Sequence, residues 1–492
     1  MSWSLVEAYD EALRRLKYEP RRALEETVRA LEGGKSVLLF APTGYGKTTL
    51  TEALSLAAVN GNELFARVIH VLPLRSVVQD LYLKLRRDSE KLGIDKREVA
   101  AQDTDFNDSP YFLRKVNVTT LDTFVMNLFK LPVAELGKVA RGGGSHFELP
   151  RAMIYSSVVL FDEFHLFSED GRPLTAAIAS LRALADAGVP VVVMTATMPC
   201  FLKRLLSEYV ELKEVRATDF NVRRELSVHF IEDPSFYVPP PGKKVLFVFN
   251  TRRDAIYTYR KFRERGVSPL LLHGKLNGRD RAERLSRIDG GELVISTQVI
   301  EAGLDRSFDV LVTEAAPASA LIQRAGRVAR YGGQGEVFVF PYRGGVYNRE
   351  DVEAATRVLR DGGRLDEGLL ATEASTPKIR ETLRYSLELL DANVLTSSSD
   401  ASRLMTYMCS MVREVSTVMG FPRGCYSPEC GVPLSDREAY KLIAGGNHGV
   451  MEGREVEVRK MVKGDECLSL EFMRKGIDGI VVEYDSEVGA IL

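Results

Sequence analysis

The sequence predicts an α/β fold in which two parallel sheets follow one another along the chain, with a smaller α+β or helical part at the C-terminal end. From residue 35 onward, short apolar runs rich in β-branched residues alternate with amphipathic stretches, which is the pattern of a doubly wound parallel sheet. This pattern pauses between residues 215 and 242, which include the proline-rich stretch 239–241, and then restarts. After residue 343 it gives way to a helical pattern and short alternating runs.

The expected strands can be followed run by run. Those of the first sheet are SVLLFAP, RVIHVLP, KVNVTT, SSVVLFDE and VPVVVMTATMP, and those of the second are KVLFVFN, PLLLHG, ELVIST, DVLVTE and GEVFVF. Each is short, apolar and bounded by turn-forming or polar residues, as buried parallel strands are. We therefore expect three domains: residues 1–215, which begin with a helical segment, residues 216–345 and residues 346–492. The segment 135–157, which contains RGGGSH, is expected to be a loop.

Composition narrows the class of protein. The 492 residues are 45% hydrophobic and 27% charged, which excludes a disordered chain, and no apolar run approaches the roughly 20 residues that a membrane span needs. Five cysteines cannot all pair, so a reducing compartment is the simplest interpretation, and a cytoplasmic protein without membrane contact is expected. Cys425 and Cys430 are not followed by a second cysteine or histidine pair, and we expect no zinc site there.

The near-neutral net charge of −2 conceals an uneven distribution. Residues 346–492 carry a charge of −7 and residues 1–345 a charge of +5, of which residues 251–290 alone contribute +6. A local basic strip is therefore available for a nucleic-acid partner, although solvated helix faces also produce such runs.

A glycine-rich segment, APTGYGKTT at residues 41–49, comes directly after the first strand and before a helical run. A phosphate chain needs unhindered backbone N–H groups and a cation at the start of a helix, and Gly44, Gly46 and Lys47 supply both. The hydroxyl of Thr48 is suited to Mg²⁺. Ala41 stands where this phosphate-binding motif usually has its first glycine. The residues predicted to bind the nucleotide here are Thr43, Gly44, Tyr45, Gly46, Lys47, Thr48 and Thr49.

A second segment, VVLFDEFH, places Asp162, Glu163 and His165 at the end of a strand. An aspartate at a strand tip can hold Mg²⁺, and the neighbouring glutamate can orient the attacking water. A metalloprotease is excluded because His165 has no partner histidine four residues away.

A third segment, LIQRAGRVAR at residues 321–330, spaces Arg324, Arg327 and Arg330 three residues apart. On a continuous helix this spacing predicts a basic ridge. The planar donor fork of arginine suits the oxygens of a γ-phosphate.

The order APTGYGKT, DEFH, TAT (195–197), TQVIEAGLD (297–305) and QRAGRVAR resembles the superfamily 2 helicases, which have two RecA-like domains. It is most similar to the CRISPR-associated DExH helicase of type I interference systems, over about residues 20–335. The resemblance implies ATP and Mg²⁺ as cofactors, with Thr48 and Asp162 toward the metal and Lys47 on the β and γ phosphates. It implies a catalytic set of Lys47, Asp162, Glu163, Gln323, Arg327 and Arg330, nucleotide contacts from Gly303 and Asp305, and a coupling set of His165, Thr195 and Thr197.

The resemblance also implies a track for the sugar-phosphate backbone of single-stranded DNA. The residues expected along it are Pro73, Arg75, Thr120, Asn250, His273, Lys275 and Thr297. These side chains and loop N–H groups suit phosphate contacts and read no base edges. His273 is equally plausible as a packing residue.

Two departures from the family pattern carry consequences. The first glutamine of the chain is Gln79, so the adenine-reading glutamine that often precedes the phosphate loop is missing, and Tyr18 or Arg22 is expected to replace it. None of the six histidines precedes an aspartate, and only about 30 residues precede the phosphate-binding unit. We therefore expect the helicase part alone, without an HD nuclease domain.

The sequence thus predicts an ATP-dependent DNA translocase of CRISPR interference, moving 3′ to 5′, with a separate HD-type nuclease and the surveillance complex as partners. The alternatives are a superfamily 2 helicase of DNA repair or RNA remodelling, and an ATP-gated clamp that recruits a nuclease. The acidic residues 346–492 are open to two interpretations: a protein-docking or strand-gating part, or a structural cap.

Overall fold

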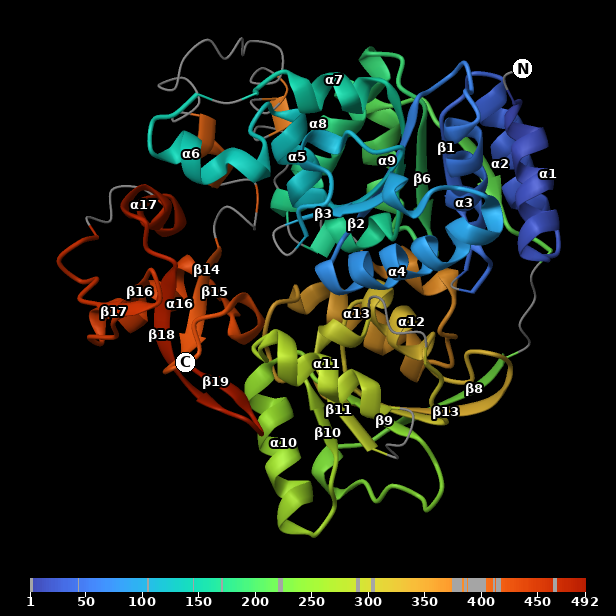
Figure 1. Cartoon of the computed structure of the whole chain (residues 1–492). Helices are drawn as coiled ribbons and strands as arrows, with labels where there is room; N and C mark the ends of the chain where they lie inside the picture. The colour runs from blue at the N-terminus through green and yellow to red at the C-terminus, as the bar shows by residue number, and fades with distance from the viewer. Residues whose placement is uncertain are drawn as a thin grey trace.

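The computed structural model describes residues 3–492 apart from residues 43, 104–105, 145, 170, 220–223, 289–292, 302–305, 374–382, 385–386, 388–403, 410–411, 413–416 and 463–466. Three sheets follow one another along the chain, each with its own helices (Figure 1). The first two are parallel and the third is mixed, which confirms the fold class expected from the sequence.

The first sheet has seven strands in the order β3-β4-β2-β5-β6-β1-β7, and all its pairings are parallel. The strands are β1 Val37–Phe40, β2 Arg67–Leu72, β3 Val99–Gln102, β4 Val116–Thr120, β5 Ser157–Phe161, β6 Val191–Thr195 and β7 Lys213–Arg216. The helices are α1 Leu5–Leu16, α2 Arg22–Glu32, α3 Lys47–Val59, α4 Arg75–Leu92, α5 Leu121–Leu128, α6 Leu136–Ala140, α7 Leu149–Tyr155, α8 Gly171–Asp186 and α9 Cys200–Tyr209. Helices α6 and α7 lie where a loop had been expected.

Both faces of this sheet are buried, which explains its uninterrupted apolar strands. Along β1, Leu38 and Phe40 face a core with α5, α8 and α9, whereas Val37 and Leu39 face a core with α1, α2 and α3. Alternation along a strand sends successive side chains to opposite faces, so helices on both faces require apolar residues at every position.

The second sheet has six strands in the order β10-β11-β9-β12-β13-β8, again all parallel. The strands are β8 Arg224–Phe230, β9 Val245–Val248, β10 Leu270–Leu272, β11 Leu293–Ser296, β12 Val310–Glu314 and β13 Gly333–Phe340, and the helices are α10 Arg252–Glu264, α11 Gly278–Arg287, α12 Ala318–Ala325 and α13 Arg349–Arg360. Because β8 is already an edge strand of this sheet, the proline-rich stretch 239–241 lies inside the second unit and not in the connection between the sheets, where it had been expected.

The C-terminal unit is built on a mixed sheet in the order β15-β14-β18-β16-β17, with β19 paired to β18. Its strands are β14 Thr417–Pro422, β15 Val432–Ser435, β16 Gly449–Met451, β17 Arg454–Val456, β18 Gly479–Asp485 and β19 Gly489–Ile491, and its helices include α16 Asp436–Ala444 and α17 Leu468–Lys475. Only the β14–β18 pairing is parallel among those described.

The C-terminal unit contacts both of the units that are built on parallel sheets. Helix α17 packs against α6 of the first unit, and Leu470 and Leu136 share one apolar core (Figure 1). At its other end, the β18–β19 turn lies against the second unit, where Arg284 donates a hydrogen bond of 2.9 Å to the carbonyl oxygen of Glu487. The unit therefore bridges the two parallel-sheet units.

Two disulfides in the C-terminal unit correct the expectation of reduced cysteines. Cys409 is bonded to Cys467, at the start of α17, and Cys425 is bonded to Cys430. Cys200 is free and exposed. Among the described residues, no helix has the length and apolar character that a bilayer span requires.

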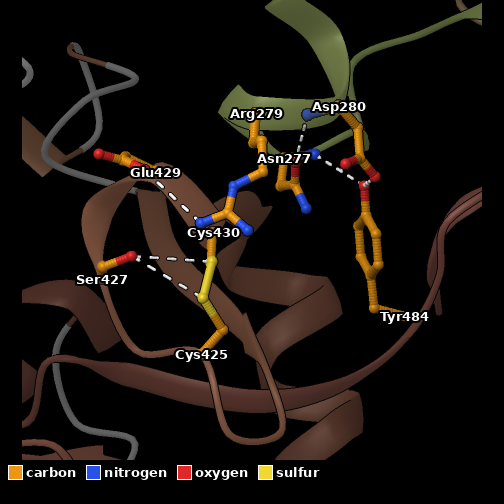
Figure 2. The surroundings of a disulfide bond; sticks show 8 residues. All are labelled: Asn277, Arg279, Asp280, Cys425, Ser427, Glu429, Cys430 and Tyr484. Carbon is orange, nitrogen blue, oxygen red and sulfur yellow. Dashed lines mark hydrogen bonds and ion pairs between the residues drawn. A yellow bond between two sulfur atoms is a disulfide. The ribbon is translucent and has the colours of Figure 1, made fainter. Parts of the chain in front are cut away.

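Figure 2 shows the second disulfide beside the contact between the C-terminal unit and the start of α11. The hydroxyl of Tyr484 donates to a carboxylate oxygen of Asp280 at 2.5 Å and accepts from the backbone N–H of Asn277 at 3.2 Å. Arg279 lies 3.7 Å from the carboxylate of Glu429, the residue that precedes Cys430. The short disulfide-closed turn thus presents Glu429 to α11.

Candidate nucleotide site and strand face

The phosphate-binding segment turns into α3 through two left-handed glycines. Gly44 has φ of 87° and Gly46, which caps the helix, has φ of 97°, a region that residues with a side chain adopt only with strain. Lys47 is the first helical residue, Thr48 is half-buried and Thr49 is buried. Thr43 lies outside the described residues.

Lys47 joins the two predicted carboxylates in one cluster. Its Nζ lies 2.9 Å from Oε1 of Glu163 and 3.2 Å from Oδ1 of Asp162. Burial opposes the charge on Lys47, but the two carboxylates outweigh it and raise the pKa of the ammonium above its usual range. Burial likewise opposes the charge on Asp162, and Lys47 with His70 outweighs it and lowers the pKa of that carboxyl. Lys47 and Asp162 are therefore held in their charged forms at neutral pH.

Glu163 stands in an uncommon backbone conformation at this strand end. Its φ is 49°, in the left-handed region that non-glycine residues rarely adopt. Strain of this kind persists where the surroundings over-determine it and is frequent at functional sites.

The predicted coupling residues form a short hydrogen-bonded chain in the first unit. His165 is buried, and its Nδ1 lies 2.8 Å from Oγ1 of Thr195, whose hydroxyl donates to the carbonyl oxygen of Thr197. The side chain of Gln323, on α12 of the second unit, lies beside His165 and slightly opposes the lowering of its pKa. Burial lowers the pKa of His165, which favours the neutral imidazole that such a chain needs.

The expected basic ridge is wrong, because α12 ends at Ala325 and Gly326 caps it. Arg327 and Arg330 therefore lie beyond the helix. The guanidinium of Arg327 donates to the backbone oxygen of Glu301, and the backbone N–H of Arg330 donates to Oγ of Ser307 at 3.1 Å. Gly303 and Asp305 lie outside the described residues.

Arg324 is buried instead of exposed. Its Nε lies 2.7 Å from Oε1 of Glu301, and its Nη atoms donate to Oγ1 of Thr313 and Oδ1 of Asn250, each at 3.0 Å. Neither side chain of the Arg324–Glu301 pair is more than 1% exposed. The arginine therefore ties α12 to the interior of the second unit.

The residues predicted to touch the strand divide into two groups. In the first unit, Pro73 lines a cavity of about 210 Å³ with Leu121 and, from the second unit, Gln298, while Arg75 begins α4 and Thr120 caps α5. This cavity lies between the two units.

The second-unit members of the predicted track are engaged within the protein. Nδ2 of Asn250 donates to the carbonyl oxygen of Ala315 at 3.0 Å, and Thr297 is buried at the end of β11.

The other two second-unit members, His273 and Lys275, contact the C-terminal unit. His273 is buried with Nε2 3.1 Å from the carbonyl oxygen of Val488, and Nζ of Lys275 lies 2.6 Å from the carboxylate of Glu438. Burial, with the nearby guanidinium of Arg252, lowers the pKa of His273 to about 3, so its ring is neutral. In this structure His273 is buried, and Lys275 is partly buried and paired with Glu438.

Two features of the site were not found from the sequence. The Tyr45 ring is buried, and its hydroxyl donates to Oδ1 of Asp219 at 2.6 Å and accepts from the backbone N–H of Ala23 at 3.0 Å. It thereby ties the phosphate loop to the chain that leads into the second unit. The other is His70, in the middle of β2, with Nε2 3.6 Å from Oδ2 of Asp162. A histidine inside the apolar run RVIHVLP was the available signal.

The oxygen atoms at this site suit Mg²⁺. The cation prefers carboxylate, hydroxyl and phosphate oxygens and keeps several waters, so one or two protein ligands suffice. The charged carboxylate of Asp162 and the hydroxyl of Thr48, beside the helix start that would receive the phosphates, provide this donor set. In the described part of the chain, no group of three or more histidine, cysteine, aspartate or glutamate side chains is arranged to hold a metal.

The Tyr18 and Arg22 side chains, expected near the adenine, are both exposed. The backbone N–H of Arg22 donates to the carboxylate of Asp219 at 2.8 Å, and the ring of Tyr18 lies 5.7 Å from Nζ of Lys84.

Comparisons with known proteins agree with the motifs. Residues 21–205 match the model of the DEAD/DEAH box helicase family, and residues 241–333 match that of the C-terminal part of the CRISPR-associated nuclease/helicase Cas3. The CRISPR-associated helicase Cas3 of Thermoproteus tenax is 28% identical over 383 residues, which cover 72% of this chain and 66% of that protein. The nuclease/helicase Cas3 of Methanothermobacter thermautotrophicus is 27% identical over 334 residues, which cover 61% of this chain and 39% of that protein.

Solved structures share the fold. The ADP-bound Cas3 of T. fusca aligns with a TM-score of 0.67 at 16% identity, over 99% of this chain and 72% of that one. S. cerevisiae Dbp5 bound to RNA and ADP BeF3 aligns with a TM-score of 0.54 at 15% identity, over 78% of this chain and 97% of that one. The two parallel sheets are thus the tandem RecA-like domains of these proteins. The chain thus combines a DEAD/DEAH box helicase domain with a Cas3-like C-terminal helicase domain, which makes it an ATP-dependent helicase similar to the CRISPR-associated Cas3 proteins.

Proposed function

We propose that this chain is an ATP-dependent translocase on single-stranded DNA that acts in CRISPR interference. It would move 3′ to 5′ and unwind target DNA at the surveillance complex for a separate HD-type nuclease. One observation carries the proposal: Lys47, Asp162 and Glu163 form a single ion-paired cluster, and His165 beside it lies next to Gln323 of the second domain. A hydrolytic site linked to the opposite domain is what a closing motor requires.

The geometry supports a sequence of exchanges on nucleotide binding. The phosphates of ATP compete with the carboxylates for Lys47, whose ammonium would then hold the β and γ phosphates. Release from Lys47 would leave the carboxylate of Glu163 free to orient the attacking water, and Asp162 with Thr48 would hold Mg²⁺. The metal, when bound, would supply positive charge to the phosphates.

Domain closure would complete the site from the other side. Arg327 and Arg330 belong to the second domain. An arginine that reaches the phosphates from outside the nucleotide-binding domain contributes a factor of about 10³ to 10⁵ to the hydrolysis rate. Opening after hydrolysis, relayed through His165, Thr195 and Thr197, would advance the strand.

Two findings support the CRISPR setting and the separate nuclease. The relatives from Thermoproteus tenax and Methanothermobacter thermautotrophicus are described as CRISPR-associated. None of the six histidines of this sequence precedes an aspartate, so the His-Asp dipeptide on which an HD nuclease depends does not occur in it.

The first test is hydrolysis stimulated by single-stranded DNA. We expect Lys47→Ala to abolish stimulated ATPase activity, because the phosphates lose their cation, and Arg327→Ala to lower it by about 10³-fold. Lys460→Ala is the matched control, since this lysine is 80% exposed in the C-terminal unit, and it should leave the rate unchanged. Full stimulated activity in Lys47→Ala would overturn the proposed hydrolytic site.

The second test identifies the substrate. Single-stranded DNA should stimulate hydrolysis more than RNA of the same sequence, and the reverse would indicate RNA remodelling. Duplexes with a 3′ overhang should be opened in preference to those with a 5′ overhang. Binding and slow hydrolysis without strand displacement, even with the nuclease present, would indicate a clamp. Affinity should fall steeply with salt, because phosphate contacts release counterions.

A further inference from the structure

His70 is a buried histidine that links the helix of the phosphate loop to Asp162. It lies in the middle of β2, between β4 and β5, and is 1% exposed. On one side, Nδ1 lies 2.8 Å from Oγ1 of Thr51, which is on α3 one turn after Lys47. On the other side, Nε2 lies 3.6 Å from Oδ2 of Asp162.

The hydrogen-bond partners determine the tautomer of this ring. Nε2 is buried and has no partner within hydrogen-bonding distance, and Oδ2 of Asp162 lies 3.6 Å from it. A proton on Nδ1 would leave the lone pair of the buried Nε2 facing a carboxylate oxygen, which is unfavourable. If the hydroxyl of Thr51 donates to Nδ1, the proton resides on Nε2 and points at Asp162. The second arrangement gives Nδ1 a hydrogen bond and replaces the repulsion at Nε2 by an attraction.

The two oxygens of Asp162 have different neighbours. Oδ1 accepts from the backbone N–H of Glu163 at 2.8 Å and lies 3.2 Å from Nζ of Lys47. Oδ2 has His70 beside it. Since Lys47 is the group that the phosphates would draw away, the Nε2–H of His70 remains the side-chain contact that fixes the carboxylate plane once nucleotide has bound.

We infer that His70 is a positioning residue for Asp162: with Thr51 holding its ring, its Nε2–H fixes the orientation in which the carboxylate meets Mg²⁺. This inference rests on the proposed nucleotide function of the site. Groups that orient a metal-binding carboxylate typically contribute 10-fold to 100-fold in metal affinity.

The test compares two replacements of His70 in the full chain. His70→Phe keeps a planar ring of similar size without N–H groups, and His70→Gln keeps an N–H donor near the position of Nε2. Each variant is loaded with a fluorescent ADP analogue, and Mg²⁺ is titrated at equilibrium. We expect His70→Phe to bind Mg²⁺ at least 10-fold more weakly and His70→Gln to recover to within about threefold of the unaltered protein.

A second readout separates positioning from damage to the pocket. Affinity for the same analogue in EDTA, where no metal contributes, should stay within twofold in both variants. An unchanged Mg²⁺ affinity in His70→Phe would overturn the inference, and so would a His70→Gln variant as weak as His70→Phe.

The role of Thr51 is tested by a double-mutant cycle. Thr51→Val should weaken Mg²⁺ binding in the unaltered background and have no further effect in His70→Phe, because both changes remove one interaction. Ser55→Ala is the matched control: Ser55 is buried one turn further along α3, and its hydroxyl bonds to its own helix. Additive effects of Thr51→Val and His70→Phe on Mg²⁺ affinity would contradict the inference that Thr51 acts through His70.

Failure of this inference is distinguishable from failure of the proposed function. Mg²⁺-dependent ATPase activity in the unaltered protein together with normal Mg²⁺ affinity in His70→Phe overturns only the role of His70. An unaltered protein that binds no nucleotide with Mg²⁺ overturns both.

Discussion

Replacing Arg324 by alanine tests the buried ion pair of the second domain. The change leaves the carboxylate of Glu301 without its partner, and removal of one member of such a pair costs about 3–5 kcal/mol. Oγ1 of Thr313 and Oδ1 of Asn250 also lose a donor. Each buried polar group left unsatisfied costs about 1–3 kcal/mol, so the expected loss is at least about 5 kcal/mol. This is comparable to the whole stability of many domains.

The chain offers a natural assay for where the loss occurs. Its single tryptophan, Trp3, packs against the core of the first domain, so tryptophan fluorescence reports that domain alone. In urea, far-UV circular dichroism of Arg324→Ala should show an early transition that Trp3 fluorescence does not. Arg349→Ala is the control, because this arginine of α13 is 73% exposed, and such changes stay within about 0.5 kcal/mol.

The loss should depend on pH in a defined direction. Burial raises the pKa of Glu301, and Arg324 opposes that rise. Without Arg324, the pKa of Glu301 in the folded state rises further above its value in the unfolded state. The folded state is then less destabilised when Glu301 is protonated than when it is charged. Stability of the variant should therefore fall as the pH rises from the unfolded pKa toward the folded one. A loss below about 1 kcal/mol, or the same loss at pH 5 and pH 8, would refute this reasoning.

Three further changes test other parts of the structure. Reduction of the Cys409–Cys467 disulfide, which spans 58 residues, should lower the free energy of unfolding by about 4 kcal/mol and lower the melting temperature of the C-terminal unit. Cys409→Ser should melt at the same lowered temperature without reductant. An unchanged melting temperature would contradict a stabilising role of the bond. Tyr45→Phe should lower the free energy of unfolding of the first domain by about 1–2 kcal/mol, since two hydrogen bonds share its hydroxyl; an unchanged urea midpoint would count against them. Gly489→Val places Cβ 2.5 Å from a backbone oxygen of the second domain and should speed proteolysis of the C-terminal unit, whereas Gly453→Val, with a similar φ but open space, should not. Equal cleavage of the two variants would mean that backbone strain alone is responsible.

The strands that the sequence predicted are those buried on both faces. The runs of β1, β5 and β9 are continuously apolar because helices cover each side. Strand β3, with the sequence VAAQ, lacks β-branched residues apart from its first, and β7 and β8 are edge strands with exposed polar residues. Local patterns do not distinguish such strands from loops.

In the candidate site too, local sequence patterns predicted some features, and others depend on the fold. The phosphate loop and the DEFH segment could be paired in advance, because both follow strands whose carboxyl ends meet at one edge of a parallel sheet. Spacing alone placed Arg324 on an exposed ridge, since it indicates neither where α12 ends nor which side is buried.

Long-range pairings also escaped prediction. The contacts of His273 and Lys275 with the C-terminal unit join residues more than 150 positions apart, and the bond between Cys409 and Cys467 joins residues 58 positions apart. No periodicity in the sequence encodes such partners.

The C-terminal unit restricts how the two RecA-like domains can move relative to each other. The two RecA-like domains are joined once by the chain that leads from β7 to β8, and a second time through a body that touches α6 at one end and α11 at the other. Two bodies held at two places form a closed linkage with fewer degrees of freedom than two bodies on a single tether. Rotation about the line through both attachments requires the least free energy. Any other displacement must deform the C-terminal unit or detach one of its ends. The attachment points of the third unit thus limit the directions in which the two domains can move relative to each other.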